Sequence, residues 1–256
     1  MKYVSRANLP DAAKIVVIGE KYSKILEKPL KTRGIDVLSV PDNPNVGESV
    51  SGHADLSALH VGGKMIALAP YLKGSGFAES LSAMGFELSF PEITQGKRYP
   101  KDAALNVCLC GNKLIYNPKS AEKTIVEYLT NSGGYEALPV KQGYTKCSVC
   151  VVNESSIITS DEGIHKRAVE TGMESLKVAP GFISLPGFDY GFIGGASFKL
   201  SKHELAFTGK LDGHPDKDKI IEFISLHNIE PVYITEKPAF DIGSCIQIVE
   251  KQQPEP

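Results

Sequence analysis

Pairs of short apolar runs separated by tight turns recur along the chain. The first run of each pair contains one small polar residue, and the aligned polar positions are 42 to 49 residues apart. The five first runs lie at residues 52–61, 103–110, 145–152, 194–200 and 241–248. Their aligned polar residues are Ser57, Asn106, Ser148, Ser197 and Ser244. This regular spacing predicts an internal repeat, each copy beginning with a strand.

Each of the first four repeats continues with the same order of elements. Gly, Asn and Ser turns between two apolar runs predict a β-hairpin. A helix and a short third strand are expected after each hairpin. The second runs lie at 64–68, 113–116, 156–159 and 204–207. Helices are predicted over 77–84, from Asn117-Pro118, from Ser160-Asp161-Glu162 to near Gly172, and from Pro215. Third strands are predicted at 86–90, 136–140 and 231–234.

The fifth repeat stops at Glu250, and the N-terminus can complete it. Residues 14–18 and 35–40 read as strands, and 20–33 as a helix that Pro29 breaks or kinks. We predict a single α/β domain over 1–256, a five-bladed α/β propeller of ββαβ repeats with pseudo-fivefold symmetry, closed by both termini. An open doubly wound sheet is the alternative, but hairpins before the helices disfavour it. The repeats lie near 52–91, 102–140, 144–180, 190–235, and 241–250 plus 12–41.

Composition narrows the class of protein. The formal net charge is −2 and no long basic run occurs, so we expect no nucleic-acid partner. No apolar run approaches the ~20 residues that span a bilayer, and residues 1–10 do not read as a signal peptide. Five cysteines, an odd number, predict a reducing compartment and hence a cytoplasmic protein. The sequence predicts no oligomeric state.

This repeat architecture resembles the guanidino-group-modifying superfamily, the penteins, whose fold is a five-bladed α/β propeller. Residues 241–248 look like the Gly-rich strand that carries the superfamily's nucleophilic cysteine, which implies that role for Cys245. Gly52-His53-Ala54-Asp55 is similar to the Gly-His-x-Asp/Glu motif, which implies a general base at His53 and a guanidinium-binding carboxylate at Asp55. Catalytic members carry the histidine two blades before the cysteine, whereas that blade here reads Thr145-Lys-Cys-Ser. The chain therefore resembles an uncharacterised branch.

The first strands of a propeller lie nearest its axis, so one side chain per blade can converge there. Attack on a guanidinium carbon needs a thiolate, a proton shuttle and carboxylates. We expect Asn106, Ser197, Asp189 and Asp241 to bind the substrate around Cys245, His53 and Asp55. Other structural readings remain open: Cys245 as a buried inert thiol, His53 as a turn cap, and residues 186–195 as a plain connection.

The other four cysteines offer a competing interpretation. Cys108, Cys110, Cys147 and Cys150 together could bind zinc, but their spacing is imperfect. Cys108 aligns with Cys150 as an apolar strand position, so we expect core packing and predict no metal or cofactor. Asp212-Gly-His214-Pro-Asp216 reads as the start of a helix rather than as a metal site.

The sequence supports two classes of function. The first is a hydrolase or transferase that acts on a small cationic guanidino or amidine substrate through a covalent Cys245 intermediate. The second is a non-catalytic pentein-like module that binds a small molecule or a protein partner. A reactive thiol within reach of His53 would favour the first class.

Overall fold

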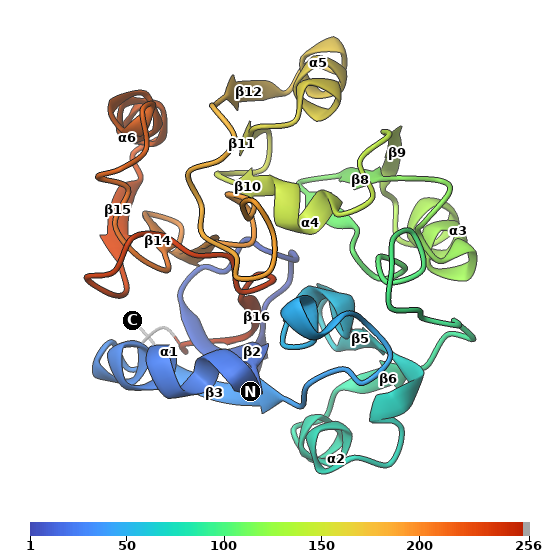
Figure 1. The fold of residues 1–256 in the computed structure, drawn as a ribbon. Helices are drawn as coiled ribbons and strands as arrows, with labels where there is room; N and C mark the ends of the chain where they lie inside the picture. The colour runs from blue at the N-terminus through green and yellow to red at the C-terminus, as the bar shows by residue number, and fades with distance from the viewer. Residues whose placement is uncertain (253–256) are drawn as a thin grey trace.

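The computed structural model describes residues 1–252 and arranges five small sheets as a ring around a central axis (Figure 1). The helices that connect the strands lie on the outside of the ring, and the first strand of each sheet lies nearest the axis. This is the predicted α/β propeller. No helix in the described part of the chain combines the length and apolarity that a membrane span requires.

Four blades share one plan. Their first two strands pair antiparallel, and the second pairs parallel with the third after an external helix. The first blade contains β4 (Ala58–Gly62), β5 (Met65–Leu68), α2 (Gly76–Ala83) and β6 (Glu87–Ser89); the second contains β7 (Cys108–Cys110), β8 (Lys113–Tyr116), α3 (Lys123–Asn131) and β9 (Glu136–Pro139). The third contains β10 (Val149–Val151), β11 (Ser156–Thr159), α5 (Glu162–Glu170) and β12 (Glu174–Lys177); the fourth contains β13 (Ser197–Ser201), β14 (Glu204–Phe207), α6 (Lys217–Leu226) and β15 (Glu230–Tyr233).

The fifth blade joins the two ends of the chain, as predicted. Its strands are β16 (Ile246–Glu250), β2 (Ala13–Gly19) and β3 (Asp36–Val40), and α1 (Glu20–Thr32) covers it. β16 pairs antiparallel with β2, which pairs parallel with β3. A short strand that was not predicted, β1 (Lys2–Tyr3), pairs with the other edge of β16.

The predicted helix break at Pro29 and the predicted helix cap at Asn117 are not found. Pro29 does not end α1, which continues to Thr32 because the fully buried Leu26 and Leu30 anchor its last turns. Asn117 does not cap α3; its side chain instead accepts a hydrogen bond from the Lys119 amide at 2.8 Å and donates to a loop carbonyl. The cap of α3 is Glu122, whose carboxylate accepts from the backbone amide of Ile125.

The inner segments also begin differently from the prediction. They enter the axis as turns, and the strands follow only after them. Residues Ala54–Leu56 form the short helix η2, and Thr145–Ser148 form α4. Of the five aligned polar residues only Ser197 lies within a strand, as the first residue of β13. The turns therefore present their side chains to the middle of the ring.

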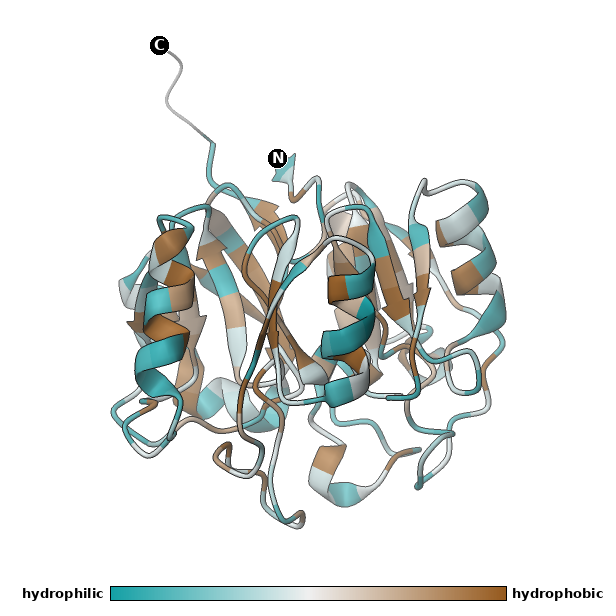
Figure 2. Cartoon of the chain, turned by 90° about the horizontal axis from the view of Figure 1, so that it is seen from above, coloured by the Kyte–Doolittle hydropathy of each residue, from teal (hydrophilic) through white to brown (hydrophobic). Residues whose placement is uncertain are grey.

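Apolar clusters fill the spaces between neighbouring blades. One cluster joins Leu26 of α1 with Phe198 of β13, and another joins Ile158 of β11 with Ile224 of α6. Each helix that covers a blade thus has one buried face, which packs into these clusters, and one exposed face. The same division is visible in Figure 2, where the strands are mostly brown and the helices mix teal with brown.

The two ends of the axis differ. The N-terminal segment, residues 4–11, lies across the hairpin turns at one end. The Gly63 amide donates to the Val4 carbonyl at 2.8 Å, and the Lys202 amide donates to the Asp11 carbonyl at 3.2 Å. The Asn8 side chain donates to the Leu109 carbonyl at 2.9 Å. At the opposite end, where the first strands begin, the inner turns converge.

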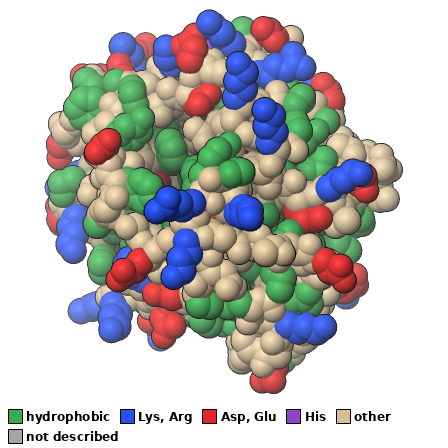
Figure 3. All heavy atoms as spheres, turned by 45° about the vertical axis from the view of Figure 1, so that its right-hand side comes forward, with side chains coloured by type: hydrophobic (Ala, Val, Ile, Leu, Met, Phe, Trp, Pro, Cys, Tyr) green, Lys and Arg blue, Asp and Glu red, His purple; other side chains and the backbone are tan. Residues whose placement is uncertain are grey.

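Charges of both signs are interspersed on the face in Figure 3. Acidic and basic side chains form several pairs over the surface, such as Lys14 with Asp36 and Lys166 with Glu162. The face in the figure therefore carries no uniform field of one sign.

Candidate active site

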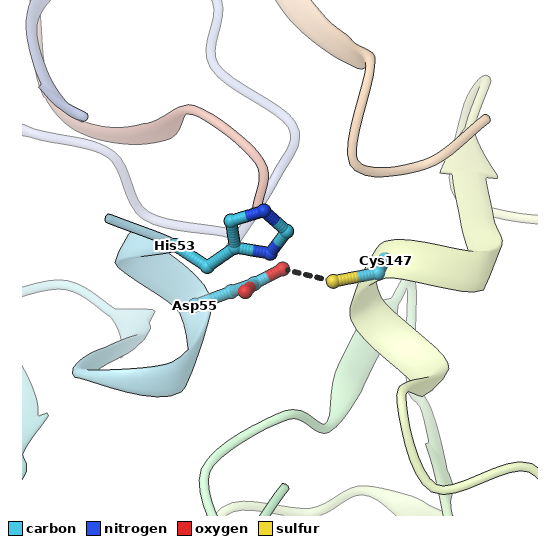
Figure 4. A group of neighbouring side chains, drawn as sticks. All are labelled: His53, Asp55 and Cys147. Carbon is cyan, nitrogen blue, oxygen red and sulfur yellow. Dashed lines mark hydrogen bonds between the residues drawn. The ribbon is translucent and has the colours of Figure 1, made fainter. Parts of the chain in front are cut away.

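Three side chains from two blades meet at the axis. His53 is the N-cap residue of η2, Asp55 lies within η2, and Cys147 lies in α4. The Cys147 thiol donates a hydrogen bond to Asp55 Oδ2 at 2.9 Å, and the His53 ring lies beside this pair (Figure 4). One polar atom from each of the three lies within 4.8 Å of the other two. All three residues are buried.

Asn106 of the second blade positions Cys147. Its amide nitrogen donates to Cys147 Sγ at 3.3 Å, and its oxygen accepts from the Lys146 amide at 2.8 Å. The hydroxyl of Thr145 donates to the Asn106 carbonyl at 2.9 Å. The start of α4 is therefore tied to the neighbouring blade by buried hydrogen bonds.

The fifth blade supports Asp55. Ser244 Oγ donates to Asp55 Oδ2 at 3.0 Å, and the Asp55 amide donates to the Gly243 carbonyl at 3.1 Å. Ser244 has a φ of 67°, an unusual value for a residue with a side chain, and this turn directs its hydroxyl toward the axis. Asp55 Oδ1 has no hydrogen-bond partner in the described chain and remains available.

Asp241 adds a second buried carboxylate. Its oxygens accept from the backbone amides of Phe192 and Gly243, both at 2.8 Å. Oδ1 also lies 4.0 Å from His53 Nε2. A Cβ atom on Gly195 would lie 1.9 Å from this oxygen, so the approach of the two segments requires glycine at position 195.

Burial dominates the protonation of the site. It lowers the pKa of His53 to about 4 and raises the pKa of Asp241 to about 6. The pKa of Asp55 is raised by burial, and that of Cys147 is raised well above its usual range by burial and by the nearby Asp55 and Asp241 charges. The site therefore holds a neutral imidazole and a neutral thiol at pH 7. A bound cation would favour ionisation of the carboxylates and of the thiol.

A cavity of about 240 Å³ opens above these residues. Its floor includes His53, Cys147 and Asp241, and its walls come mainly from the loop that precedes β13. The complete lining is Val50, His53, Tyr144, Cys147, Leu185, Phe188, Asp189, Tyr190, Phe192 and Asp241. A small molecule in this cavity would touch the thiol, the imidazole and a carboxylate together.

The structure places Cys245, the predicted nucleophile, away from this cavity. Its side chain is fully buried in an apolar cluster with Ile18, Leu26 and Ile242. Burial among these side chains raises the pKa of its thiol. Because the neighbouring Ser244 turns toward Asp55, Cys245 turns toward the core. This correction moves the candidate thiol to Cys147.

The predicted substrate-binding residues are divided. Asp241 and the exposed Asp189 line the cavity. Asn106 lies behind Cys147 and bonds to it, so it holds the thiol and does not face the cavity. Ser197 is buried at the start of β13 and is absent from the lining.

Sequence reasoning assigned Cys147 to core packing together with three other cysteines. That expectation agrees with the apolar clusters around Cys108, Cys110 and Cys150. Cys147 differs from the other three in its position within the aligned repeats. It precedes the aligned polar residue Ser148, on the inner turn, whereas the other three follow their aligned polar residues. The walls Tyr144 and Phe192 carried no comparable signal.

The donor set also fits a metal ion. A thiol, an imidazole and a carboxylate within 4.8 Å of one another are ligands that Zn²⁺ accepts in tetrahedral sites. Three protein ligands would leave a fourth position toward the cavity. The absence of a metal, expected from the sequence, remains a prediction.

Comparisons with known proteins agree with the fold. The sequence model of one family, described as "Family of unknown function (DUF6873)", matches residues 17–246. No curated protein matches the chain in sequence.

Several solved structures share the architecture over nearly the whole chain. An inosamine-phosphate amidinotransferase from Streptomyces griseus is similar with a TM-score of 0.61 and 12% identity, covering 100% of this chain and 99% of that one. An agmatine deiminase from C. jejuni gives 0.57 and 8%, covering 98% and 97%. DDAH from Pseudomonas aeruginosa gives 0.54 and 10%, covering 88% and 94%. The chain therefore has the fold of the guanidino-modifying superfamily.

Proposed function

The chain belongs to the family DUF6873, and we propose that its axial site modifies the guanidino or amidino group of a small molecule through Cys147. One observation carries the proposal: a thiol, an imidazole and the Asp241 carboxylate line the floor of one cavity, and the thiol donates a hydrogen bond to a second carboxylate, Asp55. Thiols attack planar cationic carbon, and carboxylates bind the N–H groups of the same cation. The named activities of the structural neighbours, amidinotransferase and deiminase, are consistent with this chemistry.

The first chemical step would form a bond between Cys147 Sγ and the central carbon of the cation. The thiol proton passes to Asp55 Oδ2, which already accepts a hydrogen bond from it at 2.9 Å. The tetrahedral adduct then expels one amine as the C–N bond breaks. The proton then has to pass from Asp55 to the departing amine, and the His53 ring, which lies beside Asp55, would relay it.

The second step would release Cys147. Attack by water on the S-bound carbon forms a C–O bond, breaks the C–S bond and returns the proton to the thiol, which makes the protein a hydrolase. Attack by an acceptor amine in the same way transfers the amidino group. Asp241 beside His53 would hold the cationic group during both steps, because its carboxylate is fixed by two backbone amides.

Binding without turnover is the alternative function. The pKa values of the empty site favour it, because Cys147 is held as a thiol and His53, with a pKa of about 4, is held neutral. A guanidinium ion would still be attracted by the two carboxylates. Such a protein would bind the cation and release it unchanged.

The test uses 2-chloroacetamidine, a small cationic alkylating reagent, and its uncharged analogue 2-chloroacetamide. We expect Cys147 to be labelled at least tenfold faster by the cation, since Asp55 and Asp241 attract it, with the modified residue located by peptide mass mapping. Cys147→Ser should abolish the fast labelling, and Cys245→Ser should leave it unchanged. Equal rates for the two reagents, or preferential labelling of Cys245, would overturn the assignment. Fast labelling without product from any guanidine would establish the binding function instead.

A further inference from the structure

The cavity is lined by acidic side chains and, among residues 1–252, by no lysine or arginine, which limits the charge that its ligand can carry. Two of the lining residues, Asp189 and Asp241, are acidic, and no Lys or Arg within the described chain lines the cavity. Asp189 stands at the exposed side and Asp241 at the buried floor. A ligand with its own carboxylate would place that group between two acids without a cationic partner, which is unfavourable.

Two lysines act on the site through their charge but do not line the cavity: Lys146 lowers the pKa of Asp241 and of Asp55, and Lys21 lowers the pKa of His53. Lys146 is adjacent to Cys147 in sequence, but it lines a separate small opening with Asn8 and Asp55. Lys21 is exposed and packs against Gly52, outside the cavity lining. Neither side chain is placed to pair with an anionic group of a ligand above Cys147.

Aromatic rings form most of the wall. The rings of Tyr144 and Phe192 lie 6.3 Å apart, and Tyr190 packs edge-on against Phe192 at 6.3 Å. The Tyr144 hydroxyl donates to Asp102 Oδ2 at 2.7 Å, which fixes its ring. Phe188 is 54% exposed, a large exposure for a phenylalanine. These rings offer stacking and cation–π contacts to an apolar ligand body.

We infer that the substrate is a small guanidine or amidine carried on an apolar, preferably aromatic, body without a carboxylate. The inference rests on the proposed function, because it places the cationic group on Asp241 beside Cys147. The body then lies between Tyr144 and Phe188, and the aromatic side chains of the lining cover it. A cavity of about 240 Å³ accommodates a single ring with its cationic substituent and little more.

Matched pairs of ligands test the inference by isothermal titration calorimetry with the full chain. Phenylguanidine is compared with 4-guanidinobenzoate, and butylguanidine with 4-guanidinobutyrate. We expect each carboxylate to weaken binding at least tenfold, and phenylguanidine to bind more tightly than butylguanidine. Equal or tighter binding of the carboxylates would refute the inference and leave the proposed function intact. Failure of all four to bind, together with equal labelling of Cys147 by the two alkylating reagents, would refute the proposed function.

Variants assign the effect to particular side chains. Phe188→Ala should weaken phenylguanidine at least fivefold, whereas Phe182→Ala should not, because Phe182 is similarly exposed at 47% but does not line the cavity. Asp189→Lys supplies the missing cation. It should raise the affinity for 4-guanidinobenzoate, relative to that for phenylguanidine, at least tenfold. In Phe188→Ala, an unchanged rate of Cys147 labelling by chloroacetamidine would show that the axial site of the variant is still folded. If Asp189→Lys leaves the ratio unchanged, the charge argument is wrong.

Discussion

Burying the ionised carboxylate of Asp241 lowers the free energy of unfolding. Replacing Asp241 with asparagine should recover part of that loss. Burial raises the pKa of Asp241 from 3.8 to about 6, which corresponds to about 3 kcal/mol at 1.36 kcal/mol per pKa unit. Below pH 3.8 the carboxyl is protonated in both the folded and the unfolded chain, so no such cost exists. Between pH 3.8 and 6 the unfolded chain ionises first, and the folded state loses this stability as the pH rises. Above pH 6 the loss is complete.

Asparagine does not titrate, so the difference in free energy of unfolding between wild type and Asp241→Asn should change by about 3 kcal/mol across this range. Asparagine also has one acceptor oxygen fewer for the amides of Phe192 and Gly243, which costs about 1–3 kcal/mol. That cost is the same at every pH, so the pH dependence of the difference isolates the carboxylate.

Urea unfolding at pH values from 3.5 to 7.5, approximate bounds chosen to bracket the titration, measures this difference directly. Asp189→Asn is the control, because it removes a carboxylate from the same cavity at an exposed position. If the difference in free energy of unfolding between wild type and Asp241→Asn does not change with pH, burial of the Asp241 carboxylate does not destabilise the fold and the reasoning is refuted.

Three further predictions concern the same site. Gly195→Ala should displace Asp241, cost about 1–3 kcal/mol of stability and abolish the preference of Cys147 for chloroacetamidine, whereas Gly213→Ala, with open space around it, should do neither in unfolding and labelling assays. Phenylguanidine should bind more weakly as the pH falls below about 6, because Asp241 in the empty cavity then takes up a proton; calorimetry at constant ionic strength would show a flat profile if the carboxylate is not the anchor. Zn²⁺ should slow the labelling of Cys147, and EDTA should restore the original rate. His53→Ala should weaken this protection by Zn²⁺. An unchanged labelling rate in Zn²⁺ would show that His53, Asp55 and Cys147 do not bind the metal.

The ring and its closure were predictable because they depend on a pattern that repeats. Each blade needs two apolar runs, a turn and an amphipathic helix, and these signals are local. The conversion of the inner segments into turns was not predictable, because it depends on contacts between blades. Asn106, for example, bonds to the start of α4 in the next blade, 40 residues along the chain. No local preference of residues 145–148 indicates that contact.

The site likewise has residues that local sequence indicates and residues that only the packing of blades brings together. His53 and Asp55 could be identified because they belong to one short segment and project from one turn. Cys147 reaches Asp55 across 92 residues of sequence, and this approach depends on the way two blades pack. Cys245 follows Ser244 directly, yet the two side chains point in opposite directions, one into the core and one to the axis. The positive φ of Ser244 in that turn decides which of the two side chains faces the axis.

The mixed origin of the fifth blade also constrains how the protein is made. Its strand β2 is synthesised long before its antiparallel partner β16; Asp11 and Glu250, which bond across this junction, are 239 residues apart. Until β16 has been synthesised, β2 therefore has an unpaired edge, which is a hazard for aggregation. The four internal blades can form from nearby residues, whereas closing the ring carries the largest loop-closure entropy. We expect this junction to form last in folding and its separation to be the step by which the ring opens.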